Sequence, residues 1–241
     1  ILMKNKLILL RHGESIWNLE NRFTGWTDVD LTENGINEAK NAGILLSSHN
    51  IKIDLVYVSF LKRAIKTYKI CLKQLEIDNI DLLSHWRLNE RHYGNLQGLN
   101  KQQTAKKFGD DLVLKWRRSY DTPPPPMSPD DRRHPRHDIL YKDIDPKKLP
   151  NAESLRDTLE RVKPLLINQI IPLFKKGQNI MIVAHGNSLR AIIKILKDIS
   201  NKDIINLNIP TGFPYIFEFD NNLDVKKENF LGNQEKILKK I

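Results

Sequence analysis

The chain has 241 residues, of which 40 % are hydrophobic and 28 % charged, an ordinary balance for a folded domain. That length suits one large α/β domain or two small ones, with a core that needs no metal or disulfide. No apolar run approaches the roughly 20 residues of a membrane-spanning helix, and Leu7–Leu10 is too short for a signal-peptide core. A single cysteine, Cys71, excludes an internal disulfide. We therefore expect a cytoplasmic protein that does not bind membranes.

The net charge is +10, from 39 lysines and arginines against 29 aspartates and glutamates. Such an excess suits an anionic partner: nucleic acid, a membrane surface or phosphorylated small molecules. The basic residues are spread along the chain, and no zinc-ligand spacing or RNA-binding aromatic motif accompanies them. Charge alone therefore leaves the class of partner open.

The first half of the chain alternates strand and helix patterns. The continuous apolar run Leu7–Leu10 predicts a strand buried on both faces. Thr32 is a predicted N-cap, and apolar residues at helical spacing follow it as far as Leu46. Residues 55–58 predict a second strand, and the next helix has an apolar face made of Ala64, Tyr68, Cys71 and Leu75.

The second half continues this alternation. Residues 180–184 are the most apolar strand of the sequence, and a helix is predicted from Ser188 to Leu196. Residues 155–174 have a helical pattern that Pro164 is expected to kink. Residues 215–219 predict a late strand at an edge of the sheet. The whole predicts an α/β fold: one three-layer α/β/α domain over 1–241, with a mixed, mostly parallel sheet.

Residues 122–150 interrupt the pattern with most of the chain's prolines, many charges and few apolar residues. A linker is one interpretation. We favour an inserted active-site loop that forms a lid, because strong α/β patterns resume after it. The basic segment 234–241 is predicted to be a mobile tail.

Arg11-His12-Gly13-Glu14 directly follows the first strand, where ligands collect in open α/β sheets. A neutral imidazole can accept a phosphoryl group, and the Arg11 fork suits phosphate oxygens. Gly13 permits a close backbone approach. Taken alone, so short a motif favours a buried histidine without a catalytic role.

Three further positions strengthen the phosphoryl-transfer interpretation. Arg63 opens a helix against the helix dipole, which a bound phosphate would explain; the alternative is a solvated surface arginine. His185 repeats the strand-His-Gly-helix pattern, so two histidines can converge, and it would stabilise the phosphoryl charge. Glu90 could take and return the proton of the reacting hydroxyl. Two histidines and a glutamate could also bind a metal, but no second carboxylate completes a cluster, so we expect none.

Motifs in a fixed order cover the chain from Lys6 to about Asn233. They are Leu10-Arg11-His12-Gly13-Glu14-Ser15, Trp17-Asn18, Asn21-Arg22-Phe23-Thr24-Gly25-Trp26, Glu90-Arg91-His92-Tyr93-Gly94, Gln97-Gly98-Leu99-Asn100-Lys101, Trp116-Arg117-Arg118, Ala184-His185-Gly186-Asn187-Ser188, Asn208-Ile209-Pro210-Thr211-Gly212 and Leu231-Gly232-Asn233. This set resembles the cofactor-dependent phosphoglycerate mutases of the histidine phosphatase superfamily. Arg-His-Gly alone would indicate only the superfamily.

The resemblance implies a glycolytic and gluconeogenic isomerase that interconverts 3-phosphoglycerate and 2-phosphoglycerate through a phosphohistidine, with 2,3-bisphosphoglycerate as the priming donor. His12 would be phosphorylated and Glu90 would exchange protons, with Arg11, Arg63 and His185 completing the catalytic set. The implied substrate-binding residues are Ser15, Asn18, Thr24, Gly25, Arg91, Tyr93, Lys101, Arg117, Arg118, Gly186 and Asn187. It also implies a homo-oligomer, a dimer or tetramer, that binds small phosphoglycerates and no nucleic acid.

Three alternatives rank below this interpretation. Bisphosphoglycerate mutases tend to have glycine where Ser15 stands and differ around Thr24-Gly25. A broad phosphatase would lack the acid-binding set of Lys101, Arg117 and Arg118. A nucleic-acid-binding domain would need its positive charge on one face. The family does not require Pro123–Pro126 or the basic stretch 132–137, and the short lysine-rich tail leaves the phosphoenzyme lifetime open.

Overall fold

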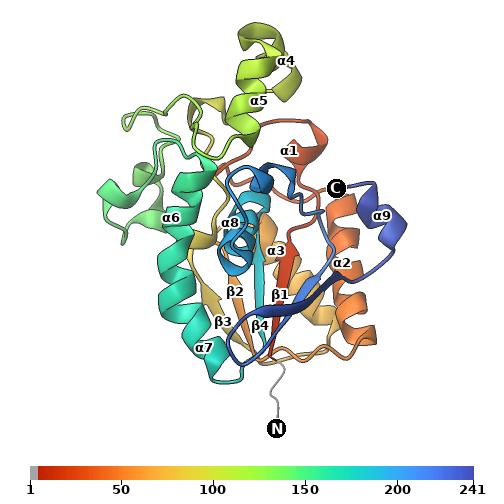
Figure 1. Ribbon diagram of the computed structural model, residues 1–241. Coiled ribbons are helices and arrows are strands. Elements are labelled where there is room, and N and C mark those ends of the chain that lie inside the picture. The colour runs from red at the N-terminus through yellow and green to blue at the C-terminus, as the bar shows by residue number, and fades with distance from the viewer. Residues whose placement is uncertain (1–4) are drawn as a thin grey trace.

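The computed structural model describes residues 5–241; residues 1–4 of the predicted domain lie outside the described part. One six-stranded sheet has the order β3-β2-β4-β1-β5-β6 (Figure 1). The first four strands pair in parallel, whereas β5 pairs antiparallel with β1 and β6 pairs antiparallel with β5. The strands are β1 (Lys6–Arg11), β2 (Leu55–Val58), β3 (Asp81–Ser84), β4 (Ile180–Ala184), β5 (Tyr215–Phe219) and β6 (Val225–Phe230). The predicted mixed, mostly parallel sheet is confirmed.

Helices cover both faces of the sheet, which confirms the three-layer architecture (Figure 1). Alternate residues of β1 face opposite layers, as strand geometry requires. Ile8 and Leu10 pack with the helices of one layer, and Leu7 and Leu9 with those of the other. The first layer contains α2 (Glu33–Ser48) and α3 (Lys62–Gln74); the second contains α6 (Leu155–Leu165), α7 (Ile171–Lys175) and α8 (Gly186–Lys197).

The local signals for helices are largely confirmed. Thr32 caps α2, because its Oγ1 accepts a hydrogen bond from the Gly35 amide at 3.0 Å. The expected irregularity is not at Pro164, which lies inside α6; a π-helical stretch, Leu166–Ile170, follows between α6 and α7. Proline removes a helical donor and crowds the turn that precedes it, so the π-helical stretch is explained by Pro172 at the start of α7, whereas α6 continues regularly through Pro164.

One strand prediction is wrong and two strands were missed. β5 is not an edge strand, because β6 pairs with its outer side. β6 carries charged residues such as Lys226 and Lys227 and lacks an apolar run, so its pattern did not indicate a strand. β3 is the opposite edge, and all four of its residues are exposed. Edge strands bury little apolar surface, which weakens their sequence pattern.

Further short elements lie around the carboxyl ends of the parallel strands. Figure 1 shows α4 and α5 projecting beyond this end of the sheet, with α1 beside them and α9 next to α2. Within residues 5–241, no helix has the length and apolar content needed to cross a membrane. The elements are α1 (Ile16–Leu19), α4 (Lys101–Phe108), α5 (Asp110–Arg118), α9 (Gln234–Leu238) and 3₁₀ turns at 86–88, 94–96, 135–137, 139–141, 146–148 and 203–206.

Candidate active site

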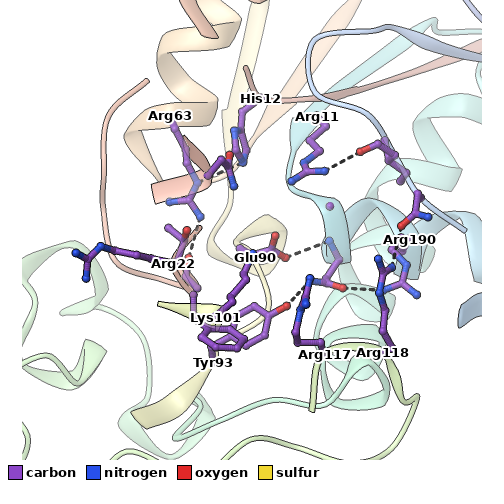
Figure 2. A pocket seen from close by; sticks show the side chains of 18 of the residues that line it. Arg11, His12, Arg22, Arg63, Glu90, Tyr93, Lys101, Arg117, Arg118 and Arg190 are labelled. Carbon is purple, nitrogen blue, oxygen red and sulfur yellow. Dashed lines mark hydrogen bonds between the residues drawn. The ribbon is translucent and has the colours of Figure 1, made fainter. Parts of the chain in front are cut away.

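A cavity of about 320 Å³ opens where β1 and β4 end (Figure 2). Its volume is at the small end of the range for metabolite sites, and it lies where open α/β sheets bind ligands. Figure 2 shows His12 and Arg63 on one side and Arg117 and Arg118 on the other, with Glu90 between them. The predicted site residues that line it are Arg11, His12, Asn18, Thr24, Gly25, Arg63, Glu90, Tyr93, Lys101, Arg117, Arg118, Gly186 and Asn187.

Three predicted site residues lie outside this lining. Ser15 is fully buried and caps α1. Arg91 is also fully buried, and its guanidinium donates to the carbonyl oxygens of Glu153 and Trp116. His185 lies beside His12, with ring centroids 4.9 Å apart. These contacts give Ser15 and Arg91 supporting positions rather than places on the cavity wall.

His12 has a defined tautomer in this environment. Its Nδ1 lies 2.6 Å from the Gly13 carbonyl oxygen, which can only accept, so Nδ1 carries the hydrogen. Arg63 Nε donates to His12 Nε2 at 3.3 Å, so Nε2 has the lone pair. Burial, Arg63 and Arg11 together lower the pKa of His12 well below its ordinary value. The imidazole is therefore neutral at physiological pH and has a nucleophilic nitrogen.

A close backbone contact holds the loop that carries His12. A Cβ on Gly13 would come within 2.1 Å of the Gly35 carbonyl oxygen, so the loop lies directly against the start of α2. The Glu14 amide donates to Glu38 of α2 at 2.7 Å. Gly13 thus permits the close approach expected from sequence, but the neighbour is a helix of the same chain.

Arg63 is buried, with 1 % of its surface exposed, so the alternative of a solvated surface arginine is wrong. Its Nη1 donates to Thr27 O at 3.0 Å and its Nη2 to Gly25 O at 2.8 Å. Gly25 has φ +54°, a conformation that glycine adopts readily. Burial lowers the pKa of Arg63 to about 10, which leaves the guanidinium charged beside His12.

His185 is held by a residue that the sequence analysis left without a role. Ser59, at the end of β2, lies with its Oγ 2.7 Å from His185 Nε2, and Ser59 Oγ also accepts the Leu61 amide hydrogen bond. His185 Nδ1 is buried and has no hydrogen-bond partner among residues 5–241. Burial, Arg63 and His12 lower the pKa of His185 well below its ordinary value. This imidazole is also neutral, with one nitrogen uncommitted.

Glu90 lines the cavity with a partly committed carboxylate. Its Oε1 accepts from the Arg91 amide at 2.8 Å and from the Asn187 amide at 3.1 Å. The second of these donors belongs to the first turn of α8, where helix amides favour negative charge. No hydrogen bond within residues 5–241 engages Oε2, so this oxygen is free to interact with a ligand.

Asn18 receives its orientation from Ser15 through a capping box. Ser15 Oγ accepts from the Asn18 amide at 3.2 Å, and the Ser15 amide donates to Asn18 Oδ1 at 3.1 Å. Since Oδ1 faces Ser15, the Nδ2 donors of Asn18 are free to face the cavity. Ser15 therefore acts on the cavity through Asn18.

The cavity wall is strongly cationic. Burial, Arg117 and Arg11 lower the pKa of Lys101 to about 8. Arg118 is held by Asn208, whose Oδ1 accepts from Nη1 at 2.8 Å. Among the described residues, the lining includes one carboxylate side chain, Glu90, against eight cations: Arg11, Arg22, Arg63, Lys101, Arg117, Arg118, Arg190 and Lys240. Such a wall suits a small ligand with several negative charges.

Several lining residues were missed by sequence reasoning: Arg22, Arg190, Asn208 and Lys240. Arg22 and Asn208 lie within quoted motifs but were given no role. Arg190 follows Asn187 by three residues on α8, and this i, i+3 spacing could have indicated it. Lys240 comes from the tail, which has no motif.

The cavity lining includes no residue of the predicted lid, 122–150, among those the structure describes. That segment packs behind the wall: Tyr141 stacks on Trp26 with ring centroids 5.0 Å apart. Asn89 Nδ2 donates to its hydroxyl at 2.8 Å. The tail forms α9, after which Lys240 bonds to Glu38 and lines the cavity. The lid function and the mobility of the tail stay predictions.

A buried ion pair supports the segment that carries Glu90. Arg161 Nε lies 2.7 Å from Glu153 Oε2, and both side chains are at least 95 % buried. Arg161 also donates to the carbonyl oxygens of Arg87, Asn89 and Glu90. The same carboxylate accepts the His92 amide at 2.9 Å through Oε1. These bonds fix residues 87–92 against α6.

Histidine, cysteine and carboxylate side chains form no group of three or more that could hold a metal ion within residues 5–241. The donors of the cavity are instead guanidinium, ammonium, amide and imidazole groups, which suit an anionic ligand.

Comparison with known proteins agrees with this geometry. Residues 7–134 and 127–228 match the model of the histidine phosphatase superfamily, branch 1. The chain is 54 % identical over 234 residues to 2,3-bisphosphoglycerate-dependent phosphoglycerate mutase 2 of Bacteroides thetaiotaomicron, covering 97 % of this chain and 94 % of the relative. It is 55 % identical to the 2,3-bisphosphoglycerate-dependent phosphoglycerate mutase of Parabacteroides distasonis, with the same coverage. The chain belongs to the 2,3-bisphosphoglycerate-dependent phosphoglycerate mutase family.

Solved structures share the fold of this phosphoglycerate mutase family member at lower identity. A putative α-ribazole-5′-phosphate phosphatase of Escherichia coli superposes with a TM-score of 0.70 at 21 % identity, covering 95 % of this chain and 97 % of that one. A mycobacterial glucosyl-3-phosphoglycerate phosphatase superposes with a TM-score of 0.67 at 22 % identity, covering 88 % and 92 %. These two likenesses concern the fold alone.

Proposed function

We propose that this chain interconverts 3-phosphoglycerate and 2-phosphoglycerate, with 2,3-bisphosphoglycerate as the priming donor and His12 as the phosphoryl carrier. The main support is the neutral His12 with its Nε2 lone pair beside Arg63, in a cavity that also contains Glu90. A nucleophile, a cationic phosphoryl site and a proton-exchanging carboxylate are the groups that this transfer needs.

One end of the cavity transfers the phosphoryl group and the other binds the rest of the substrate. His12 Nε2 attacks phosphorus while Arg63 and Arg11 offset the charge on the phosphoryl oxygens. His185, whose ring lies beside that of His12, stabilises the same group. Glu90 Oε2 takes the proton from a hydroxyl that attacks the phosphohistidine and returns it to the departing oxygen. Lys101, Arg117 and Arg118 bind the rest of the glycerate.

The residues fit the bisphosphorylated priming donor. Arg11 lines the cavity, and its Nε is buried with no hydrogen-bond partner within residues 5–241. An uncommitted guanidinium donor in a cationic cavity matches a ligand with two phosphates and a carboxylate. Arg11 and Arg63 would hold one phosphate and Lys101, Arg117 and Arg118 the other end. When bound, 2,3-bisphosphoglycerate supplies the phosphoryl group that primes His12.

Turnover assays separate this proposal from its rivals. Conversion of 3-phosphoglycerate is measured with and without catalytic 2,3-bisphosphoglycerate, alongside release of inorganic phosphate. We expect mutase turnover that the priming donor stimulates and that exceeds hydrolysis. Unstimulated turnover, or phosphate release as the main reaction, would refute the proposal. Dominant synthesis of 2,3-bisphosphoglycerate would indicate the synthase branch instead.

We further propose a cytoplasmic homo-oligomer, a dimer or tetramer, that binds phosphoglycerates and no nucleic acid. The cytoplasmic location is supported by the single cysteine, Cys71, which is fully buried. Its burial raises the pKa of the thiol to about 12. Oligomerisation rests on family resemblance. Light scattering after size exclusion tests it, and a mass of one chain at micromolar concentration would contradict it. A filter-binding titration with duplex DNA tests the proposal that the chain binds no nucleic acid.

A further inference from the structure

Arg190 is a buried arginine of α8 that no motif assigned to a task. Its side chain is at the cavity with Glu90 and Tyr93, although only 5 % of the residue is exposed (Figure 2). Nη1 donates to Asn187 Oδ1 at 2.9 Å and Nη2 donates to Ile204 O at 2.7 Å. It forms no ion pair with any described carboxylate. A buried charge held only by neutral acceptors calls for a reason beyond stability.

The contact with Asn187 determines which way that amide faces. A guanidinium has donors only, so the amide atom next to Arg190 must be the acceptor Oδ1. Nδ2 consequently turns away from Arg190, toward the Tyr93 hydroxyl at 3.4 Å. Because the Tyr93 oxygen accepts from Nδ2, its own hydrogen is free to point at a ligand. Arg190 thereby leaves both the Asn187 amide and the Tyr93 hydroxyl as hydrogen-bond donors toward a ligand.

We propose that Arg190 is a positioning residue that makes Asn187 and Tyr93 present hydrogen-bond donors to the anionic substrate. The identity of that anion as a phosphoglycerate rests on the proposed function. The contacts of Arg190 with Asn187 and of Asn187 with Tyr93 are independent of that function. With the amide reversed, Oδ1 would face the anion, which would lose a donor and meet a repulsive oxygen in its place. Arg190 acts through Asn187 and is not required to touch the reacting atoms.

The chemical step should depend less on Arg190 than binding does. Asn187 holds Glu90 through its backbone amide, at 3.1 Å from Oε1, and this donor is part of α8 whatever the side chain does. His12 and Arg63 lie outside the hydrogen-bond chain that starts at Arg190. Removal of Arg190 is therefore expected to raise KM more than it lowers kcat.

A double-mutant cycle tests the coupling without turnover. The dissociation constant of 3-phosphoglycerate is measured by titration calorimetry, without the priming donor, for the wild type, R190M, N187A and the double variant. We expect R190M to weaken binding about tenfold, and to have little further effect in the N187A background. An equal effect of R190M in both backgrounds, or no effect at all, would overturn the proposal.

Two polar variants cover the case that R190M does not fold. R190K has donors only, whereas R190Q can offer either a donor or an acceptor to Asn187. We expect R190K to bind 3-phosphoglycerate within about threefold of wild type and R190Q to bind about tenfold more weakly. Equal affinities of R190K and R190Q would contradict the proposal. Circular dichroism verifies that each variant is folded.

R156M is the matched control, because Arg156 is an exposed arginine on α6 outside the cavity lining. It removes the same charge and should leave the dissociation constant unchanged. The mutase assay above is independent of this cycle. An absence of donor-stimulated turnover would refute the proposed function. The dissociation constants of the variants would still decide the role of Arg190.

Discussion

Arg63 and Arg161 are two buried arginines with similar surroundings and different charge partners. Arg63 is 1 % exposed and Arg161 6 %, and each donates to at least two backbone carbonyl oxygens. Arg161 is paired with Glu153 at 2.7 Å, whereas Arg63 forms no ion pair within residues 5–241 and faces the cavity beside His12. We infer that the paired arginine serves the fold and the unpaired one serves the ligand.

Arg161→Met should give the largest loss of stability. It leaves the Glu153 carboxylate buried without its partner, and breaking a buried pair costs about 3–5 kcal/mol. Urea unfolding measures the change. The control is the double variant R161M/E153M, which removes both charges and should recover part of the loss. Equal stability of R161M and wild type would contradict a structural role.

Arg63→Met should show the opposite pattern. We expect kcat to fall by about 10²–10³-fold, as for the loss of one preorganised donor to a developing charge. The loss of stability should be smaller than in R161M, because no buried carboxylate loses its partner and only the Thr27 and Gly25 carbonyl oxygens lose a donor. Steady-state kinetics and urea unfolding of the same preparation test both halves. If R63M were strongly destabilised while its folded fraction kept the wild-type kcat, Arg63 would serve the fold and the comparison with Arg161 would be wrong.

Lys101 is a half-buried cation of the cavity wall, and its contribution to ligand binding is expected to depend on pH. Its pKa is lowered to about 8, so the free enzyme loses this cation as pH rises through that value. Affinity for an anion should fall with it, and kcat/KM should decline above about pH 8. Lys101→Arg keeps the charge and should move this decline to higher pH. An unchanged profile in K101R would show that another group causes it.

Tyr141→Phe should give the smallest effect. The hydroxyl accepts a buried hydrogen bond from Asn89 at 2.8 Å, in the segment that Arg161 also holds. Loss of one such bond costs about 1 kcal/mol. Thermal unfolding should show a small decrease, with KM unchanged. A large rise in KM would instead assign residues 122–150 a direct part in substrate binding.

The strand-end motifs predicted the centre of the site because parallel strands bring their carboxyl ends together. His12 after β1 and His185 after β4 were placed side by side by this rule alone. Side-chain direction was not predictable from a motif, so Ser15 and Arg91 were expected at the cavity and lie behind it. Arg190 was missed because its task depends on the orientation of one amide, which no sequence pattern contains.

The same reasoning explains which parts of the fold were found. Buried strands such as β4 have continuous apolar runs and were predicted to the residue. The edges β3 and β6 were missed, since a strand with one neighbour in the sheet can carry exposed or charged residues.

The most direct test is to label the enzyme with phosphoryl-labelled 2,3-bisphosphoglycerate and map the label after quenching. The account predicts one acid-labile, base-stable phosphoryl group on His12, absent from a folded H12Q variant and retained in R156M. Label that persists in H12Q, or a wild-type enzyme that turns over without ever carrying label, would contradict it.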